Sequence, residues 1–590
     1  MLLRRTLYAS LFAVLSLVLV AHAPAQTTTD NYPVFYPDAT VNLNVLHIFD
    51  QDNLGPVNYS KGANPVAEVM EGADGNLYGT AYNGGSSGCQ TPISLPGCGI
   101  VFKMTPAGTF TVLYSFGANG PSSSSAAHPN GGLLQGKDGY FYGTTREGGA
   151  FGWGSVFKVN SAGKFAIVHS FCPPGQNCGV MTPDSAYPGA TLIQASDGSF
   201  YGVTGGVIFK MTTAGKVTIL HTFGSITNDG AQPNSLVFGK DGNIYGSTYA
   251  GGTTGGGTVF KISKTGSGYT ILYSFVPGVN NNYALGANPL ARLALAPDGS
   301  FYGTTYAGGS AGSGTIFKIT TAGVLTKIAD LVFTSSPFFQ SPRTPVLVGS
   351  DGNLYTTTWR GGSFNDGTLL QSTTAGALSL VSELNFVNGV NPDDPIMLAS
   401  TGLIYGATSG GGGTNGTGLG VIYSPALTLA KPKPSITSLV PANAAIGKPV
   451  YLYGDYFVGT TSVKFNGTGA AFTVVSRQWI KATVPAGATT GPVSVVNAGG
   501  TATSASNFKV SPGISSFTPT SGTVGTTVTI TGTSFTGATK VTFGGLAASS
   551  FTVNSATQIT AMVPAGAVTG KVAVTTASGT GTSTASFTVN

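Results

Sequence analysis

A seven-residue motif recurs along most of the chain and constrains its fold more than any other feature. In its fullest form it reads Asp138-Gly139-Tyr140-Phe141-Tyr142-Gly143-Thr144. The other copies centre on Tyr78, Tyr201, Tyr245, Tyr302, Tyr355 and Tyr405. A proline precedes each tyrosine by 12 or 13 residues: Pro65, Pro129, Pro188, Pro233, Pro289, Pro342 and Pro392. We therefore predict that one structural unit is repeated seven times.

Each unit contains four short segments rich in aromatic and β-branched residues, which is typical of strands. In the second unit they are residues 131–135, 140–145, 154–159 and 165–171. Asp138-Gly139 joins the first two segments, and this dipeptide suits the two-residue turn of a tight hairpin. No segment of the unit has a helical period. Each unit is predicted to be a four-stranded antiparallel meander.

The spacing and the ends of the repeats predict a closed ring. Successive tyrosines are 44 to 64 residues apart, close to the length of a propeller blade. Residues 45–49 resemble a fourth strand with no first three strands before them, and the last unit, ending near Tyr423, lacks a fourth strand. Pairing these two segments would remove an open sheet edge. We therefore expect an all-β fold whose residues 26–426 form a seven-bladed β-propeller, with the N-terminal strand closing the last blade.

Residues 1–25 have the pattern of a signal peptide. Arg4 and Arg5 precede an apolar stretch, and Ala23-Pro24-Ala25 offers a cleavage site. No cysteine directly follows the apolar stretch, and no later segment has the length of a transmembrane helix. We expect a bacterial protein that is secreted or held at the extracellular surface, with no integral membrane segment after signal removal and no covalent anchor.

The charge of the chain argues against nucleic acid as a partner. The full sequence has 27 basic and 21 acidic residues. Loss of Arg4 and Arg5 with the signal peptide would leave a net charge near +4, and the basic residues are dispersed along the chain. A nucleic-acid-binding domain normally concentrates its positive charge in one patch.

Four cysteines in an exported chain predict disulfide bonds. Cys89 and Cys98 fall in one predicted loop, and Cys172 and Cys178 fall in another. Local pairing is the most economical of the three possible connectivities. A metal site is the alternative, but neither spacing is a tight C-x-x-C pair and no histidine lies beside these cysteines. No metal or cofactor is expected.

A second repeat follows a proline-bearing linker at residues 427–434. Its period is 78 to 79 residues, and each copy holds about seven short strands, which favours immunoglobulin-like sandwiches at residues 435–510 and 511–590. The segments 514–519, 528–535 and 541–545 closely resemble the IPT/TIG domain family. The first copy resembles this family more loosely, through residues 450–457.

The propeller repeat resembles a second family. The resemblance rests on three segments: Asp-Gly-Asn-Leu-Tyr-Gly-Thr at 74–80, the glycine-rich stretch ending in Thr-Val-Phe-Lys at 251–261, and Ile-Leu-Tyr-Ser-Phe at 271–275. These are similar to the GloVer tandem repeat of exported bacterial proteins, and the resemblance covers residues 41 to about 425. It implies export and repetition rather than a particular reaction. Members of that family end in various surface anchors, whereas no sorting tail is recognised in this sequence.

Strand order assigns the loops to two faces of the ring. The connections from first to second strand and from third to fourth strand are short Asp-Gly and Ala-Gly turns, and we call their side the tight-turn face. The other connections are long and differ between blades, including residues 117–128, 172–187 and 277–288. We call their side the long-loop face. Function concentrates in variable loops on a rigid scaffold, so we expect the site on the long-loop face.

Large side chains recur on this face four and five residues after the repeat tyrosine. The candidate ligand-binding residues are Tyr82, Arg146, Glu147, Tyr249, Tyr306, Trp359 and Arg360. Aromatic and charged side chains of this kind could stack on sugar rings or grip an extended polymer. Alternatively, the aromatic residues could simply cover the edges of neighbouring blades.

We expect a non-catalytic binding or surface-interaction protein, with a polysaccharide or a cell-surface protein as its partner. The sandwich pair would act as a spacer or docking module. The repeat aspartates are explained by their turns. A carbohydrate-active hydrolase or lyase is the main alternative, because six other acids fall on the long-loop face: Glu147, Asp184, Asp229, Asp366, Asp393 and Asp394. No pair among them stands out in the sequence, so no catalytic residue is assigned. A purely structural or adhesive surface component is the third possibility.

Overall fold

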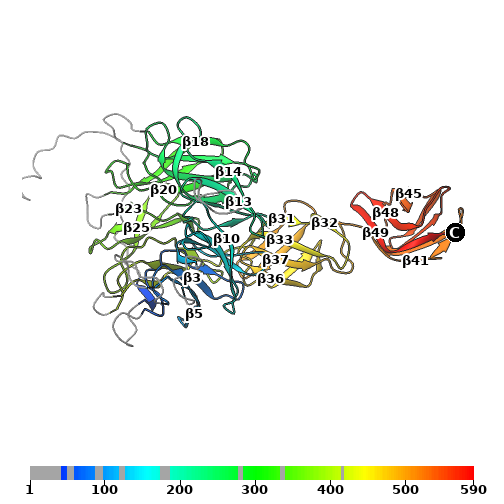
Figure 1. The fold of residues 1–590 in the computed structure, drawn as a ribbon, viewed down its shortest axis with the longest axis horizontal. Coiled ribbons are helices and arrows are strands. Elements are labelled where there is room, and N and C mark those ends of the chain that lie inside the picture. The colour runs from blue at the N-terminus through cyan, green and yellow to red at the C-terminus, as the bar shows by residue number, and fades with distance from the viewer. Residues whose placement is uncertain are drawn as a thin grey trace, which may run out of the picture. The chain divides into compact units, whose positions relative to one another are not determined.

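The computed structural model describes residues 42–49, 59–86, 97–117, 126–172, 186–276, 283–332, 339–413 and 418–590. The predicted signal peptide lies outside these residues. Every regular element in the described ranges is a β-strand (Figure 1). No helix in this part of the chain has the length and hydropathy needed to cross a membrane. The predicted all-β class is confirmed.

Seven antiparallel sheets form the blades. The first three contain β2 (Met70–Glu71), β3 (Leu77–Ala81), β4 (Ile100–Met104) and β5 (Phe110–Ser115); then β6 (Ala127–Pro129), β7 (Leu134–Gln135), β8 (Phe141–Glu147), β9 (Ser155–Val159) and β10 (Phe165–Ser170); then β11 (Ile193–Gln194), β12 (Phe200–Val203), β13 (Val207–Met211) and β14 (Val217–Thr222). Blades four and five contain β15 (Gly230–Phe238), β16 (Ile244–Gly251), β17 (Thr258–Ile262) and β18 (Thr270–Ser274); then β19 (Ala294–Leu295), β20 (Phe301–Thr305), β21 (Thr315–Ile319) and β22 (Leu325–Asp330). Blade six contains β23 (Phe339–Pro342), β24 (Leu347–Val348), β25 (Leu354–Gly361), β26 (Thr368–Ser372) and β27 (Leu378–Glu383).

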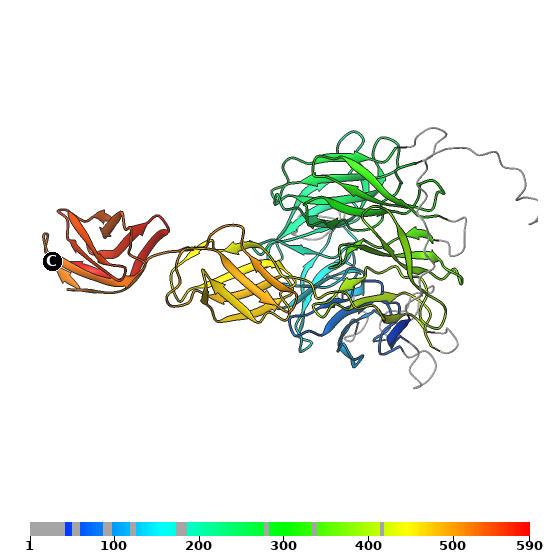
Figure 2. The same ribbon diagram turned by 180° about the vertical axis from the view of Figure 1, so that it is seen from behind.

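The seventh blade confirms the predicted closure of the ring. It contains β28 (Met397–Leu398), β29 (Ile404–Thr408) and β30 (Val421–Pro425), and its fourth strand is the N-terminal β1 (Leu43–Ile48). The strands β1 and β30 are antiparallel, with Leu43 opposite Pro425 and Ile48 opposite Val421. Figure 2 shows the blue β1 beside the yellow-green last blade. With the closing strand, blade seven has four antiparallel strands, as blade one has.

The glycine of the motif makes room for an aromatic ring on the third strand of the same blade. Gly246 lies directly opposite Phe260, and a Cβ on Gly246 would lie 2.5 Å from Phe260 Cζ. The same glycine–aromatic pairing recurs in blades one, two, three, five and seven. Blade six instead places Thr356 opposite Leu370. A larger residue on one strand is thus matched by a smaller one on the other, which preserves the packed volume.

In blades one, two, four and six, the motif's aspartate and tyrosine are joined by a hydrogen bond. Tyr78 donates its hydroxyl to Asp74 Oδ2 at 2.8 Å, and Lys103 on the third strand donates to the same oxygen. Equivalent tyrosine–aspartate bonds join Tyr142 to Asp138, Tyr245 to Asp241 and Tyr355 to Asp351. The aspartates also accept from backbone amides of their own turns. This confirms that they stabilise the hairpins.

The repeat prolines lie at the joints between blades. The residue before each proline has a left-handed backbone, with φ between 52° and 57°: Asn64, His128, Tyr187, Gln232, Asn288, Ser341 and Asn391. This conformation is costly for residues other than glycine. In return, the Asn64 amide donates to Leu419 of blade seven, and the His128 amide donates to Cys98 of blade one. A Cβ on Gly420 would lie 2.6 Å from Pro65 Cδ, so blade seven packs closely against blade one.

Two β-sandwiches follow the propeller. The first contains β31 (Ser435–Val440), β32 (Asn443–Ala444), β33 (Pro449–Asp455), β34 (Ser462–Phe465), β35 (Thr468–Gly469), β36 (Phe472–Ser476), β37 (Trp479–Thr483), β38 (Val493–Asn497), β39 (Gly500–Thr503) and β40 (Lys509–Val510). The second contains β41 (Gly513–Thr518), β42 (Ser521–Gly522), β43 (Thr527–Thr533), β44 (Lys540–Phe543), β45 (Leu546–Ala547), β46 (Ser550–Ser555), β47 (Gln558–Met562), β48 (Gly570–Thr576) and β49 (Gly579–Val589). Each sandwich encloses its own apolar core, around Phe465 in the first and Phe543 in the second.

Candidate functional site

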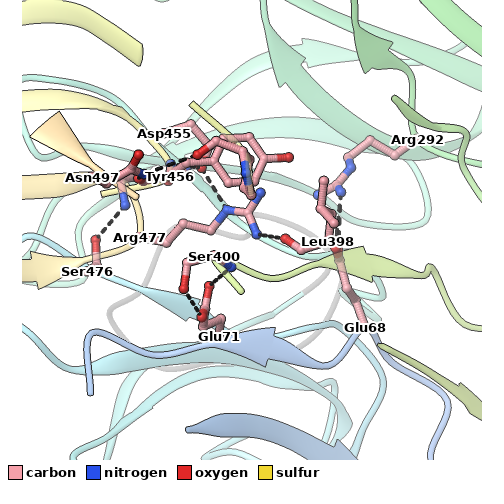
Figure 3. A network of polar contacts seen from close by, with 12 residues as sticks. Glu68, Glu71, Arg292, Leu398, Ser400, Asp455, Tyr456, Ser476, Arg477 and Asn497 are labelled. Carbon is pink, nitrogen blue, oxygen red and sulfur yellow. Dashed lines mark hydrogen bonds and ion pairs between the residues drawn. The ribbon is translucent and has the colours of Figure 1, made fainter. Parts of the chain in front are cut away.

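The first sandwich contacts the propeller at the tight-turn face. Arg477, just before β37, donates from Nη1 to the carbonyl of Leu398 in blade seven at 2.7 Å and from Nε to Asp455 Oδ1 at 2.7 Å (Figure 3). Its guanidinium also lies 4.0 Å from the centre of the Tyr456 ring. Leu398 ends the first strand of its blade, so Arg477 reaches the side where the first and second strands are joined by tight turns.

A second set of contacts joins the sandwich to blade two. Lys137 belongs to the Asp-Gly hairpin of blade two, and its Nζ lies 4.1 Å from the centre of the Tyr451 ring and 5.1 Å from that of Trp479. Cation–π contacts of this kind are individually modest. Together with the Arg477 bonds they engage tight turns from two separate blades. The chain's own sandwich therefore covers part of the tight-turn face, at blades two and seven.

An ion pair crosses the centre of the ring. Arg292 of blade five lies 3.2 Å from Glu68 Oε2 of blade one (Figure 3). Blades six and seven separate these two blades on one side, and blades two to four on the other. Side chains from two blades that are not adjacent in the ring can make contact only across its central axis. The Glu68–Arg292 pair therefore joins opposite sides of the propeller.

The long-loop face carries a cluster of aromatic and charged side chains from blades five, six and seven. The guanidinium carbon of Arg343 lies 3.9 Å from the centre of the Trp359 ring and 5.5 Å from that of Tyr306. The exposed Arg360 also lies over Trp359, at 4.3 Å. Arg343 Nη1 donates to Asp393 Oδ1 at 3.2 Å, which links blade six to blade seven. We call Tyr306, Arg343, Trp359, Arg360 and Asp393 the arginine–tryptophan cluster.

Blades one and two place a second cluster on the same face. The Tyr82 ring stacks on His128 with 4.8 Å between ring centres, and His128 Nδ1 lies 3.1 Å from Glu147 Oε2. Burial raises the pKa of Tyr82, as does the neighbouring Glu147, whereas Arg146 acts in the opposite direction. Arg146 itself is exposed and forms no ion pair with any described residue. Three predicted residues, Tyr82, Arg146 and Glu147, therefore lie together.

Tyr249 lies alone between these clusters. Its carbonyl accepts a hydrogen bond from Asn288 Nδ2 at 3.0 Å, and its side chain is partly exposed. The ring makes no aromatic or cation–π contact with the residues the structure describes. The predicted candidates therefore fall into two clusters and one separate tyrosine, all on strand ends of the long-loop face.

The non-repeat acids are in very different environments. Asp229 is buried and accepts hydrogen bonds from His221, Tyr269 and the amides of Gly224 and Gly230. Although it lines a shallow concavity of about 430 Å³, its oxygens are engaged. Asp184 lies outside the described residues. Asp366 is partly buried, and desolvation raises its pKa against the opposing effect of Arg360.

Asp394 is wholly buried, and neither carboxyl oxygen has a hydrogen-bond partner in the described part of the chain. Burial raises its pKa well above the ordinary value, and the nearby Asp393 and Glu68 raise it further. Burial also raises the pKa of Asp393, against the opposing effect of Arg343. Asp393 and Asp394 are consecutive residues of blade seven, but Asp394 has no surface through which to contact a substrate.

The cysteines are only partly described. Cys98 and Cys172 are fully buried, and no free cysteine is found in the described ranges. Cys89 and Cys178 lie outside those ranges, so the predicted disulfides stay a prediction. Within the same ranges, no group of three or more histidine, cysteine, aspartate or glutamate side chains is arranged to hold a metal ion.

Sequence reasoning missed Arg343 and His128, which hold the two clusters together. Arg343 follows a repeat proline, at the position that Asp393 occupies in the next blade. Because Arg343 and Asp393 are oppositely charged and occupy the same position in adjacent blades, their ion pair could have been predicted from the sequence. His128 stands in the place of asparagine in blades one, five and seven, so its position before a proline was visible, but its contact with Tyr82 was not.

Comparison with solved structures gives low overall similarity. A fungal alcohol oxidase of the AA5 family in complex with copper is 14% identical, with 77% of this chain and 98% of that chain covered and a TM-score of 0.37. PorZ, a surface component of the type-IX secretion system of Porphyromonas gingivalis, is 12% identical, with 74% and 58% covered and a TM-score of 0.39. SGBP-B from a xyloglucan utilization locus in Bacteroides uniformis is 25% identical, with 27% and 50% covered and a TM-score of 0.14. With TM-scores this low, none of these likenesses supports a functional argument. No curated protein matches the chain.

Family models match nearly all of the described chain. The model of the Gloeobacter/Verrucomicrobia repeat matches residues 29–205 and 188–423, which span the propeller. The model of the IPT/TIG domain matches residues 434–510 and 512–589, one match for each sandwich. Both resemblances expected from the sequence are thereby confirmed. The chain belongs to the Gloeobacter/Verrucomicrobia repeat family, and two IPT/TIG domains follow its propeller.

Proposed function

We propose that this protein is exported and uses the long-loop face of its propeller to bind a polysaccharide outside the cell. The binding is non-catalytic, and the IPT/TIG pair acts as a spacer or docking module. The contact residues are the predicted Tyr82, Arg146, Glu147, Tyr249, Tyr306, Trp359 and Arg360, together with Arg343.

One observation carries this proposal: the two ends of the propeller axis are used differently. Arg477 and Lys137 engage the first sandwich with the tight-turn face. The opposite face carries two clusters of aromatic and charged side chains, with Arg146 and Arg360 exposed. Ligand sites are normally formed by loops that a rigid scaffold leaves accessible.

The Glu68–Arg292 pair favours a ligand that lies on the face rather than one that threads the ring. An extended chain passing along the axis would have to part this ion pair and then meet Arg477 and Tyr456 at the other end. A polymer lying across the long-loop face meets neither obstacle. Partly exposed tyrosine rings such as Tyr249 and Tyr306 suit such a polymer, because they combine apolar area with a polar hydroxyl.

A carbohydrate-active hydrolase or lyase is the second candidate, favoured by one specific feature. Asp366 lies on the long-loop face with a raised pKa, the property that a general acid needs near neutral pH. Its partner would have to be Glu147 or Asp393, since Asp229 is engaged in hydrogen bonds and Asp394 is buried. Among the described acids of this set, the accessible ones, Glu147, Asp366 and Asp393, lie on three different blades.

The test is binding and turnover measured together on the chain from residue 26. The protein is incubated with a panel of neutral and acidic polysaccharides, and pull-down, reducing-end release and ultraviolet absorbance of unsaturated products are read from the same wells. Binding without release or absorbance supports the proposal. Release or absorbance that Asp366→Asn abolishes would replace it with the enzyme. No binding to any member of the panel would contradict both and favour a protein partner.

A further inference from the structure

The arginine–tryptophan cluster indicates the charge of the ligand, which the aromatic residues alone do not. Trp359 was expected to offer its ring to a sugar. In the structure two guanidinium groups already lie over that ring, at 3.9 Å and 4.3 Å. Arginine side chains bind aromatic faces in this way because the ring surface is electron-rich and the guanidinium is planar. Trp359 therefore orients cations rather than offering a free stacking surface.

The charge of this cluster is incompletely balanced. Arg343 is paired with Asp393, but its Nε is buried with no hydrogen-bond partner among the described residues. Arg360 forms no ion pair in the described ranges, although Asp366 is near enough to sense its charge. On the other side of the face, Arg146 is likewise exposed and unpaired within those ranges. Two clusters in different blades thus present unneutralised guanidinium groups.

The neighbouring acids offset little of this charge. Asp394 is buried without a hydrogen-bond donor among the described residues, and desolvation also disfavours the charged forms of Asp366 and Asp393. Glu147 contacts His128, but its side chain is 45% exposed, so it offsets part of the charge of the adjacent Arg146. In the arginine–tryptophan cluster, an approaching ligand therefore meets Arg360 at the surface, with the neighbouring acids less exposed or already paired.

We infer that the ligand of the long-loop face is an anionic polysaccharide, and that Arg360 and Arg343, held over Trp359, contact its acidic groups. The inference rests on the proposed function and narrows its ligand class. The guanidinium fork matches the two oxygens of a carboxylate, and charge-assisted bonds of this kind are stronger than neutral ones. A polymer with an acidic group on every sugar would present such groups to Arg146 and Arg360 at once. Carboxylates and sulfate esters are both anions whose oxygens accept hydrogen bonds from a guanidinium group.

The experiment uses the full chain from residue 26 and three polymers: polygalacturonate, a sulfated carrageenan and neutral xyloglucan. Affinity for each is measured at low and at raised salt for the parent, Arg360→Gln and Arg343→Gln. Lys216→Gln is the matched control, because it removes one exposed positive charge from the tight-turn face. Arg360 is exposed, so its substitution is expected to leave the melting temperature unchanged, and melting temperatures are recorded for every variant.

We expect binding to the anionic polymers that weakens with salt, because exposed charges are screened. We also expect a loss of about tenfold or more in Arg360→Gln, as for a lost charged hydrogen bond, and no loss in Lys216→Gln. Preference for polygalacturonate, abolished by reducing its carboxylates to alcohols, assigns a uronate ligand, and preference for carrageenan assigns a sulfated one.

Equal binding of xyloglucan, or an unchanged affinity in Arg360→Gln, would overturn this inference while leaving polysaccharide binding intact. Failure to bind any polymer would overturn the proposed function as well.

Discussion

The guanidinium carbon of Arg343 lies 3.9 Å from the centre of the Trp359 ring. Both residues come from blade six, and Arg343 also reaches Asp393 of blade seven. The tryptophan thus takes part in the contact between blades and in the surface that we assign to ligand binding. Trp359 therefore supports, through Arg343, the contact between blades six and seven, and its role in ligand binding stays a proposal.

Substituting Trp359 is therefore expected to affect two properties. Trp359→Ala removes the support of Arg343 and Arg360, and we expect a lower melting temperature, corresponding to about 1–2 kcal/mol of lost cation–π stabilisation, together with weaker polysaccharide binding. Tyr249→Ala is the comparison, because the ring of Tyr249 makes no aromatic or cation–π contact with described residues. It should weaken binding with stability unchanged to within about 0.5 kcal/mol. Equal losses of stability in both variants would mean that these aromatics serve packing.

The glycine–phenylalanine pair of blade four, Gly246 and Phe260, leads to a prediction about packing. Gly246→Ala places a Cβ 2.5 Å from Phe260 Cζ, and we expect it to destabilise the protein by about 1–3 kcal/mol. Gly246→Thr should be worse alone and should recover part of its loss when combined with Phe260→Leu, since this combination copies Thr356 and Leu370 of blade six. Thermal unfolding of the single and double variants measures this recovery. A double variant no more stable than Gly246→Thr would contradict compensation.

Asp394 predicts a pH dependence of stability. Burial raises its pKa in the folded state above the ordinary value of 3.8, so over the interval between these values the folded protein holds a proton that the unfolded chain has lost. Asp394 therefore lowers stability as pH rises through this interval, by up to about 1.4 kcal/mol per pH unit. Asp394→Asn removes the titration.

The check is a comparison of melting temperatures for parent and Asp394→Asn between about pH 4 and about pH 8. The advantage of the amide variant over the parent should be smallest at the acidic end and should grow with pH. Parallel curves would show that the carboxyl finds solvent or a donor in the folded protein.

Because Arg477 donates to Leu398, we expect each of the two domains to slow backbone hydrogen exchange in the other at their contact. Arg477→Met removes the bonds to Leu398 and Asp455, and we expect a loss of about 1.5–3 kcal/mol, as for hydrogen bonds to a charged group. Backbone hydrogen exchange should accelerate at residues 398–402 and 455–456. Lys481→Met, an exposed position on β37, is the control. Unchanged hydrogen exchange at residues 398–402 in Arg477→Met would contradict a rigid contact between the first sandwich and the propeller.

Much of the fold could be predicted because the repeat encodes it locally. Asp138-Gly139 predicts a hairpin, and the orphan strand near Val45 predicts the closure that β1 and β30 form. The exchange of glycine and phenylalanine for Thr356 and Leu370 was also in the sequence. That the two replacements compensate for each other can be seen only from the strand register, which places Thr356 opposite Leu370.

The site was less predictable because it depends on contacts between blades. Glu68 and Arg292 are 224 residues apart, and no local pattern relates them. The tyrosine and tryptophan positions were visible as repeat-matched aromatics, but the arginines over Trp359 follow from how blades five to seven meet. Likewise, nothing in the linker indicated that Arg477 would reach Leu398.

The most direct test of the account is a hydrogen-exchange footprint of the full chain with the polysaccharide that binds most tightly. The account predicts protection on the long-loop face, at residues 82–86, 144–149, 304–309 and 357–363, with no change at the tight turns around Asp138 or in the two sandwiches. Protection at the tight turns or in the sandwiches, with the long-loop face unchanged, would contradict the assignment of the binding face.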